Sequence, residues 1–192
     1  MKTTGLIFAG GLGRRMGNID KGLVQFNGRP MIASVIDRLR PQVDELLINA
    51  NRNPDTYGSF GYRVVSDAID GFAGPLAGLE RGLAQAAYEF VVTCPCDSPF
   101  LPNDLVTRLQ AAFTEPTIDL AVAKTGTQPH PVFCLARRSL HNHLRDFLMG
   151  GGRKIDAWYQ TLKTIEVAFD DEADAFANIN TASELSALER PR

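Results

Sequence analysis

Short apolar runs alternate with segments of helical periodicity along this chain of 192 residues. Seven runs have the length and composition of buried strands, at residues 4–8, 45–49, 62–65, 90–93, 120–123, 132–135 and 165–169. Six segments have the apolar spacing of helices, at residues 31–39, 76–87, 103–113, 139–149, 155–161 and 182–189. Because strands that alternate with helices form βαβ units, the pattern predicts a mainly parallel sheet with helices on both faces.

The second half of the chain departs from strict alternation. Two strand runs between residues 120 and 135 are joined by a short Gly/Pro segment, which indicates a hairpin and at least one antiparallel strand. The predicted fold class is therefore α/β, a Rossmann-like three-layer sandwich with a mainly parallel sheet. We expect a single domain over residues 1–192, because the length suits one core and the three glycines at 150–152 indicate a loop rather than a linker.

A glycine-rich segment follows the first predicted strand. Residues 8–21 read FAGGLGRRMGNIDK and contain four glycines, two arginines and a lysine. Glycine lets backbone N–H groups approach a ligand closely, and the cations favour phosphate, so the segment predicts a polyphosphate site. It matches neither the dinucleotide fingerprint nor the P-loop, because the third glycine and the Gly-Lys pair are missing. The alternative is a glycine-rich turn between a strand and a helix that binds no ligand.

Overall composition narrows the partners and the compartment. The net charge of −2 argues against a general affinity for nucleic acid or for anionic membranes, and no apolar run approaches the length that spans a bilayer. The three cysteines are an odd number, which argues against a disulfide framework. We therefore expect a cytoplasmic protein.

Polar residues directly follow four of the predicted strands. They are the glycine-rich segment and the residues at 49–52, 66–67 and 94–97. Because ligands bind beyond the carboxyl ends of parallel strands, we expect the four segments to meet at one edge of the sheet. Asp97 at that edge is a candidate Mg²⁺ ligand, since magnesium takes one or two carboxylates together with phosphate oxygens and water. The alternative is that Asp97 caps a helix ahead of Pro99.

Other residues near this edge allow two interpretations each. Asn49 can donate to and accept from a base or ribose, or it can satisfy nearby backbone. The glycine-rich residues 71–78, which follow Asp67, can wrap a base, or they can be a turn that leads into the helix after Gly74-Pro75. Cys94 and Cys96 are interpreted as small buried residues rather than as a redox or zinc pair.

Four further residues are weaker candidates for contact with a second substrate: His130, Arg153, Asn178 and Asn180. His130 is flanked by two prolines, and it could equally be a turn residue without a role. Arg153 follows the three glycines and could equally lie on a solvated face. Asn178 and Asn180 project on one side of an extended segment. The other two histidines, His141 and His143, lack metal-ligand spacing and are interpreted as solvated.

Several short motifs, in order along the chain, carry a resemblance to a known family. They are Phe8-Ala9-Gly10-Gly11, Arg14-Arg15-Met16-Gly17, Asp20-Lys21-Gly22, Asn49-Ala50-Asn51-Arg52, Gly74-Pro75-Leu76-Ala77-Gly78, Cys94-Pro95-Cys96-Asp97, His130-Pro131 and Asn178-Ile179-Asn180-Thr181 with Glu184-Leu185. Together they resemble the molybdenum cofactor guanylyltransferases of the nucleotidyltransferase superfamily. Two positions depart from the family's usual pattern: Phe8, where leucine is usual, and Gly13, where serine or alanine is common.

The resemblance implies an enzyme that transfers GMP from GTP to molybdenum-bearing molybdopterin, with Mg²⁺ as cofactor and pyrophosphate as the second product. It also implies cofactor-delivery proteins and molybdoenzyme apoproteins as partners. Lys21, Arg15 and Asp97 are then the expected catalytic residues, with the metal on Asp97. The expected nucleotide-binding residues are Phe8, Ala9, Gly10, Gly11, Gly13, Lys21, Asn49, Asp67, Gly78 and Asp97. The alternatives are a molybdopterin cytidylyltransferase, a sugar-phosphate nucleotidyltransferase, or a non-catalytic GTP-binding module.

Overall fold

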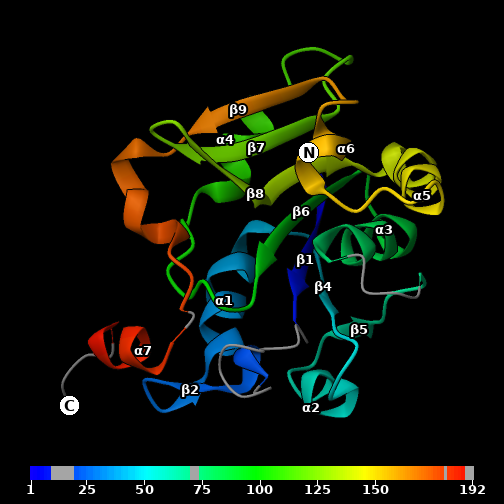
Figure 1. Ribbon diagram of the computed structural model, residues 1–192. Helices are drawn as coiled ribbons and strands as arrows, with labels where there is room; N and C mark the ends of the chain where they lie inside the picture. Colours follow the sequence, from blue (N-terminus) through cyan, green and yellow to red (C-terminus); the bar gives the residue numbers. More distant parts are fainter. Residues whose placement is uncertain (10–19, 70–73, 180, 189–192) are drawn as a thin grey trace.

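A seven-stranded mixed sheet organises the computed structural model, which describes residues 1–9, 20–69, 74–179 and 181–188 (Figure 1). Its strands are β1 (Thr3–Phe8), β4 (Glu45–Asn49), β5 (Arg63–Val65), β6 (Phe90–Pro95), β7 (Leu120–Thr125), β8 (Gln128–Arg137) and β9 (Thr164–Ala168). The strand order is β5-β4-β1-β6-β8-β7-β9, and all neighbours are parallel except that β8 runs antiparallel to both β6 and β7. The predicted α/β class with at least one antiparallel strand is confirmed.

Helices cover both faces of this sheet. The α-helices are α1 (Met31–Leu39), α2 (Pro54–Gly58), α3 (Pro75–Gln85), α4 (Leu105–Ala111), α5 (His141–Met149), α6 (Ile155–Tyr159) and α7 (Ala182–Leu188). Short 3-10 helices are η2 (Lys21–Leu23), η3 (Arg40–Gln42), η4 (Arg138–Leu140) and η5 (Asp170–Phe176). Buried residues of α1 and α4 pack on one face, and those of α3, α5 and α6 pack on the other. None of the helices in the described part of the chain is long and apolar enough to cross a bilayer.

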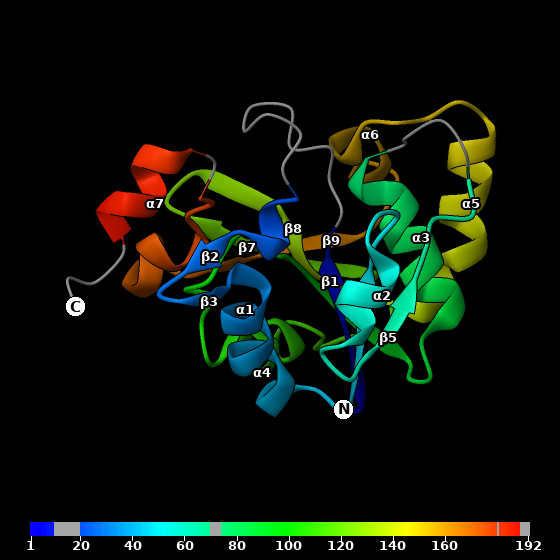
Figure 2. The same ribbon diagram turned by 90° about the horizontal axis from the view of Figure 1, so that it is seen from below.

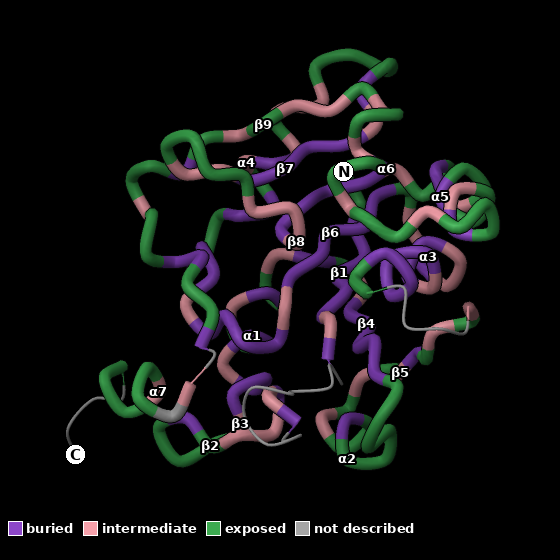
Figure 3. The backbone as a smooth tube through the Cα atoms, in the orientation of Figure 1, coloured by how far each residue is buried: buried purple, intermediate pink, exposed green. Residues whose placement is uncertain are grey.

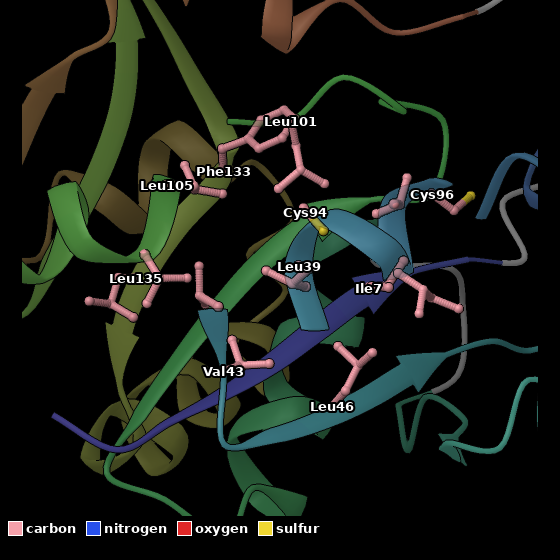
Figure 4. Close-up of a cluster of buried hydrophobic side chains, with 14 of the residues drawn as sticks. Ile7, Leu39, Val43, Leu46, Cys94, Cys96, Leu101, Leu105, Phe133 and Leu135 are labelled. Carbon is pink, nitrogen blue, oxygen red and sulfur yellow. The ribbon is translucent and has the colours of Figure 1, made fainter. Parts of the chain in front are cut away.

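Alternate residues of the strands serve the two cores. Ile7 of β1 joins the cluster with α1 and α4, whereas its neighbour Leu6 joins the cluster with α3 and α5. The period of two in a strand explains this division, and it makes every central strand apolar on both faces. Figure 4 shows the first cluster between α1 and the sheet, and Figure 3 shows that β1, β4 and β6 are buried along most of their length. The three layers predicted from the sequence are therefore present.

The hairpin of β7 and β8 contains an irregularity near its turn. Val122 pairs with Cys134, but the next residue, Ala123, pairs with His130, so that extra residues of β8 lie between the two pairs. Pro129 and Pro131 supply no backbone N–H to the ladder, and a bulge is the usual place for such residues in a sheet. The antiparallel direction brings the first residues of β8 toward the edge where β6 ends.

A third, smaller cluster joins the end of the chain to its beginning. Phe26, Met31 and Ile179 are buried together, and Leu185 of α7 packs against them. Figures 1 and 2 both show α7 beside the small sheet of β2 (Gln25–Phe26) and β3 (Arg29–Pro30). A capping box starts α7, because Thr181 Oγ1 accepts from the Glu184 N–H at 3.2 Å and Glu184 Oε2 accepts from the Thr181 N–H at 3.1 Å.

Candidate active site

The carboxyl ends of β1, β4 and β6 meet at one edge of the sheet, at the bottom of Figure 1. Backbone hydrogen bonds continue past the strands and hold the following residues together. Ala9 N–H donates to the Asn49 carbonyl at 2.7 Å, and Cys96 N–H donates to the Phe8 carbonyl at 3.0 Å. The described segments that follow these strands therefore lie side by side, as predicted. Gly10, Gly11, Gly13 and Arg15 lie outside the described residues, and the nucleotide contacts expected of Phe8 and Ala9 stay predictions.

Lys21 and Asp97 form an ion pair at this edge. Lys21 Nζ donates to Asp97 Oδ2 at 3.0 Å, and their side chains are 22% and 12% exposed. The two residues are 76 positions apart in sequence, and the ends of η2 and β6 bring them together. Asp97 does not cap a helix, because α4 begins at Leu105 with Asp104 as its N-cap residue. The alternative of a helix-capping Asp97 is therefore wrong.

A second polar group forms where β4 and β5 end. Asn49 is buried, and its Nδ2 donates to Asp67 Oδ1 at 2.9 Å and to the Val65 carbonyl at 3.2 Å. Asn51 makes a reciprocal pair with Asp67, because its Nδ2 donates to Asp67 Oδ2 at 2.8 Å and its Oδ1 accepts from the Asp67 N–H at 2.8 Å. The amides thus fix the orientation of the Asp67 carboxylate. Sequence reasoning gave Asn51 no role, although it stands at the same strand end as Asn49.

Gly78 lies in α3, and close packing explains why it is a glycine. A Cβ atom there would overlap Asn49 Oδ1 and lie 2.9 Å from Cδ1 of the Phe8 ring. The helix therefore approaches Asn49 through Gly78. Gly74 is the N-cap of α3, with a φ of 65°, and Pro75 is its first residue, so the expected turn into the helix is present. Residues 71–73 of the proposed base-binding loop lie outside the described residues.

Asp20 is a buried charge that the sequence interpretation left without a function. The residue is 7% exposed, and its carboxylate accepts from the hydroxyl of Tyr57 and from Asn53 Nδ2, the latter at 3.0 Å. Both donors come from α2 and the residue before it, a helix that the sequence analysis missed because it has only five residues. The Asp20-Lys21-Gly22 motif was the only signal that this position matters.

The cysteines next to Asp97 are buried and free, as predicted. Burial raises the pKa of the Cys96 thiol well above its usual value, and the nearby Asp97 and Asp20 carboxylates raise it further. Burial likewise raises the pKa of Cys94. Both thiols are therefore protonated at neutral pH, which makes them poor metal ligands and poor nucleophiles.

The four weaker candidates for contact with a second substrate do not all lie at this edge of the sheet. Asn178 lies at the edge, because its Oδ1 accepts from Ser98 Oγ at 2.5 Å, next to Asp97. His130 stacks on Phe176 at 4.6 Å between ring centroids, and its Nε2 lies 2.8 Å from Thr125 Oγ1. Burial lowers the pKa of His130. Arg153 is exposed, and its Nη1 donates to the Leu148 and Gly152 carbonyls at 2.7 Å each, which caps the end of α5. Asn180 lies outside the described residues.

The interpretation as solvated is wrong for His141, which is half-buried, and is confirmed for His143, which is exposed. His141 Nε2 lies 2.8 Å from Oε1 of Glu80, a residue that is 4% exposed. His143 Nδ1 accepts from Trp158 Nε1 at 3.0 Å. Each histidine therefore links α5 to a neighbouring helix, a contact between distant segments that helical spacing alone does not reveal.

The side chains at this edge suit a hard cation that is bound by one protein carboxylate and mainly by the phosphates of a nucleotide. Within the described ranges, no group of three or more His, Cys, Asp or Glu side chains could hold a metal ion. Asp97 offers a single carboxylate that is only slightly exposed. Magnesium is usually bound by one or two carboxylates, with phosphate oxygens and water as the remaining ligands, so Asp97 fits the cation that accompanies a nucleotide.

Comparison with known proteins identifies the family. The model of the MobA-like NTP transferase domain matches residues 5–164. Among similar proteins, a molybdenum cofactor guanylyltransferase of Ralstonia nicotianae is 50% identical over 198 residues, which cover 98% of this chain and 97% of the relative. Another, from Cupriavidus taiwanensis, is 52% identical over 191 residues, with 97% and 96% covered. The solved structure of molybdopterin-guanine dinucleotide biosynthesis protein A from Archaeoglobus fulgidus superposes with a TM-score of 0.79 at 23% identity, covering 97% of this chain and 96% of that one. This chain therefore belongs to the MobA-like NTP transferases, a family of nucleotidyltransferase enzymes.

Proposed function

We propose that this protein transfers GMP from GTP to molybdenum-bearing molybdopterin and releases pyrophosphate. The observation that carries the proposal is the placement of the Lys21–Asp97 pair and the Asn49–Asp67–Asn51 group on the two sides of β1, at the same edge of the sheet. The first offers an ammonium group to phosphates and a carboxylate to the Mg²⁺ that accompanies them, and the second offers polar groups to a nucleoside. The names of relatives that share about half of their residues with this chain support guanine as the base and molybdopterin as the acceptor.

The reaction forms one P–O bond and breaks another. An oxygen of the terminal phosphate of molybdopterin attacks the α-phosphorus of GTP, and the bond between the α-phosphorus and the oxygen bridging to the β-phosphate breaks. Pyrophosphate leaves with the electron pair. Since the attacking phosphate is already an anion, no strong base is needed. Repulsion between two anions is then the main barrier that the protein can lower, by positioning and by opposing charge.

Lys21 supplies that opposing charge in the proposal. Its ammonium group stabilises the negative charge that develops around the α-phosphate, while Arg15 holds the β- and γ-phosphates. Asp97 would hold Mg²⁺, which supplies Lewis-acid neutralisation of phosphate charge when it is bound. Asp97 and Lys21 neutralise each other in the absence of ligand, which keeps the edge from presenting an uncompensated buried charge.

The acceptor molybdopterin would enter from the side of the site where Asn178 and the start of β8 lie. Asn178 lies next to Asp97 through Ser98, and His130 lies at the start of β8, which reaches the same edge. Because the pKa of His130 is lowered, the ring is neutral near pH 7 and can both donate and accept hydrogen bonds. Arg153 is a weaker contact in this proposal, since one guanidinium nitrogen is already engaged by backbone carbonyls.

The proposal also includes the cellular setting. Three free buried thiols are typical of a protein that works in the reducing cytoplasm. There the enzyme would receive the pterin from cofactor-delivery proteins and pass the product to molybdoenzyme apoproteins.

A comparison of nucleotides tests the function directly. Purified protein is incubated with Mg²⁺, one of GTP, CTP or UTP, and either molybdenum-bearing molybdopterin or a sugar phosphate, and the release of pyrophosphate and the nucleotide-bearing product are measured. We expect turnover with GTP, and much less with CTP or UTP. Preference for CTP would indicate a cytidylyltransferase, and turnover only with a sugar phosphate as acceptor would indicate a sugar-phosphate nucleotidyltransferase. GTP binding without pyrophosphate release would indicate a non-catalytic module, and each of these results would overturn the proposal.

A further inference from the structure

The carboxylate of Asp20 is directed away from its own helix. Asp20 is the N-cap residue of η2, yet its side chain makes no capping hydrogen bond there. It reaches instead to α2, where the Tyr57 hydroxyl donates to Oδ1 and Asn53 Nδ2 donates to Oδ2 at 3.0 Å. Hydrogen bonds to an ionised carboxylate are stronger than neutral ones, so the two donors fix this carboxylate firmly. The backbone before Lys21 is thereby tied to a segment that lies 33 and 37 residues further along the chain.

Gly22 closes the other side of the same short segment. A Cβ atom at this position would lie 2.6 Å from the Tyr57 hydroxyl and 3.1 Å from Cys96 Sγ. The segment from Asp20 to Gly22 is therefore packed between α2 and the end of β6, and only glycine allows it to come so close. Lys21 lies in the middle of this segment. Its two neighbours are held by Tyr57, Asn53 and Cys96, and its side chain meets Asp97 from the end of β6.

A fixed backbone matters for a lysine more than for most residues. The side chain is a flexible four-carbon stem, so its ammonium group is placed accurately only if the protein restrains it. A displacement of about 1 Å at a reacting centre can cost about 10²-fold in rate. The restraint that Asp20, Tyr57 and Asn53 impose on the main chain is thus the kind of support that a phosphate-binding lysine needs.

We infer that Asp20 is a positioning residue that, through Tyr57 and Asn53, holds Lys21 where its ammonium group meets the phosphates. The inference deepens the proposed function and rests on it. Asp20 touches neither nucleotide nor metal in this view, and its effect on transfer passes entirely through Lys21. A residue that acts only through Lys21 cannot cost more than the loss of Lys21 itself, so removing the support should cost about tenfold in transfer rate against about 10²-fold for Lys21→Ala.

A double-mutant cycle separates positioning from a general structural effect. Tyr57→Phe removes one donor to Asp20 at nearly constant volume, and Asn53→Gly removes the other while tolerating the left-handed φ of 50° at that position. In the wild-type background each variant should lower kcat about tenfold, and in the Lys21→Ala background each should change it less than about twofold, because effects that pass through one residue are not additive. Tyr88→Phe is the matched control, since Tyr88 precedes β6 at the opposite edge of the sheet. An equal loss in both backgrounds would overturn the inference.

A second measurement needs no enzyme activity. Acetic anhydride labelling followed by mass spectrometry gives the reactivity of each lysine in the ligand-free protein. We expect Lys21 to be labelled several times faster in Asp20→Asn and Tyr57→Phe than in the wild type, while Lys163, whose side chain is 53% exposed, serves as internal reference. Unchanged labelling of Lys21 in Tyr57→Phe, confirmed as folded by its melting curve, would refute the positioning role. If the wild type transfers no GMP but the labelling rises as expected, the proposed function fails while the restraint on Lys21 stands.

Discussion

Gly78→Ala adds one methyl group at the point where α3 contacts the candidate site. The new Cβ would overlap Asn49 Oδ1 and come within 2.9 Å of the Phe8 ring, so Asn49 has to move. Its Nδ2 then loses the bonds to Asp67 at 2.9 Å and to the Val65 carbonyl at 3.2 Å. Overpacking a core site costs about 1–3 kcal/mol, and each lost hydrogen bond costs about 0.5–1.5 kcal/mol. Alanine returns about 1 kcal/mol as the better helix former, which leaves a net destabilisation of about 3 kcal/mol.

Urea unfolding and calorimetric titration with GTP measure the two consequences. We expect Gly78→Ala to lower the free energy of unfolding by that amount and to weaken GTP binding about tenfold, which corresponds to about 1.4 kcal/mol. Gly82→Ala is the matched control, because it lies one turn later on the same helix and its Cβ would overlap the apolar Leu6 side chain instead. That control should lose stability and keep its GTP affinity.

A second-site change tests the cause. In an Asn49→Ala background the obstructing amide is gone, so Gly78→Ala should cost at least 1 kcal/mol less in the unfolding assay than it costs in the wild type, by the usual size of a coupled pair. The reasoning is refuted if Gly78→Ala binds GTP as tightly as the wild type, or if its cost in stability is the same in both backgrounds.

Three further predictions concern single side chains. Lys21→Ala should lower GMP transfer by about 10²-fold or more, the usual cost of removing one preorganised charge-stabilising donor, and an unchanged turnover rate would remove Lys21 from the site. Asp97→Ala should abolish GMP transfer even when Mg²⁺ is supplied, because the variant lacks the proposed metal ligand. Near-normal transfer by this variant with Mg²⁺ supplied would disprove the assignment of Asp97 as that ligand. Because burial lowers the pKa of His130 in the folded protein, the unfolded chain binds more protons there, and its contribution to stability falls as the pH drops through the ordinary histidine value of about 6.5. His130→Gln should therefore lose less stability than the wild type between pH 7.5 and pH 5 in urea unfolding, and an equal loss in the two proteins would contradict the lowered pKa.

The central strands and long helices were predictable because their pattern is local. The strands β1, β4 and β6 follow from continuous apolar runs, the stripe of α1 follows from a period of 3.6 residues, and the capping box at Thr181 marks where α7 begins. The hairpin of β2 and β3 was missed although Asn27-Gly28 is a strong turn signal, with φ values of 51° and 80°. A strand of two residues has no measurable period, so only the turn residues could have indicated it.

The candidate site was partly predictable for a different reason. Asn49, Asp67 and Asp97 follow parallel strands, and the rule that strand ends meet at one edge brings them together without any structural information. That rule does not reach Tyr57 or Asn51, whose importance depends on contacts with Asp20 and Asp67 across 37 and 16 residues. Such pairings are set by tertiary packing, and no spacing in the sequence encodes them.

The closing stretch of the chain has a practical consequence for protein engineering. The family model ends at residue 164, but Ile179 N–H donates to the Asp97 carbonyl at 2.9 Å, and Ile179 packs with Phe26 and Met31 just after the Lys21 segment. A chimera whose crossover point is placed at that boundary would replace the segment that contacts Asp97, Phe26 and Met31 with a foreign sequence. A crossover within the glycine tract at 150–152 would transfer α6, β9 and residues 170–188 together. It would still separate Ile179 from its packing partners Phe26 and Met31. Grafts between relatives should therefore exchange residues 21–31 and 176–188 as a set.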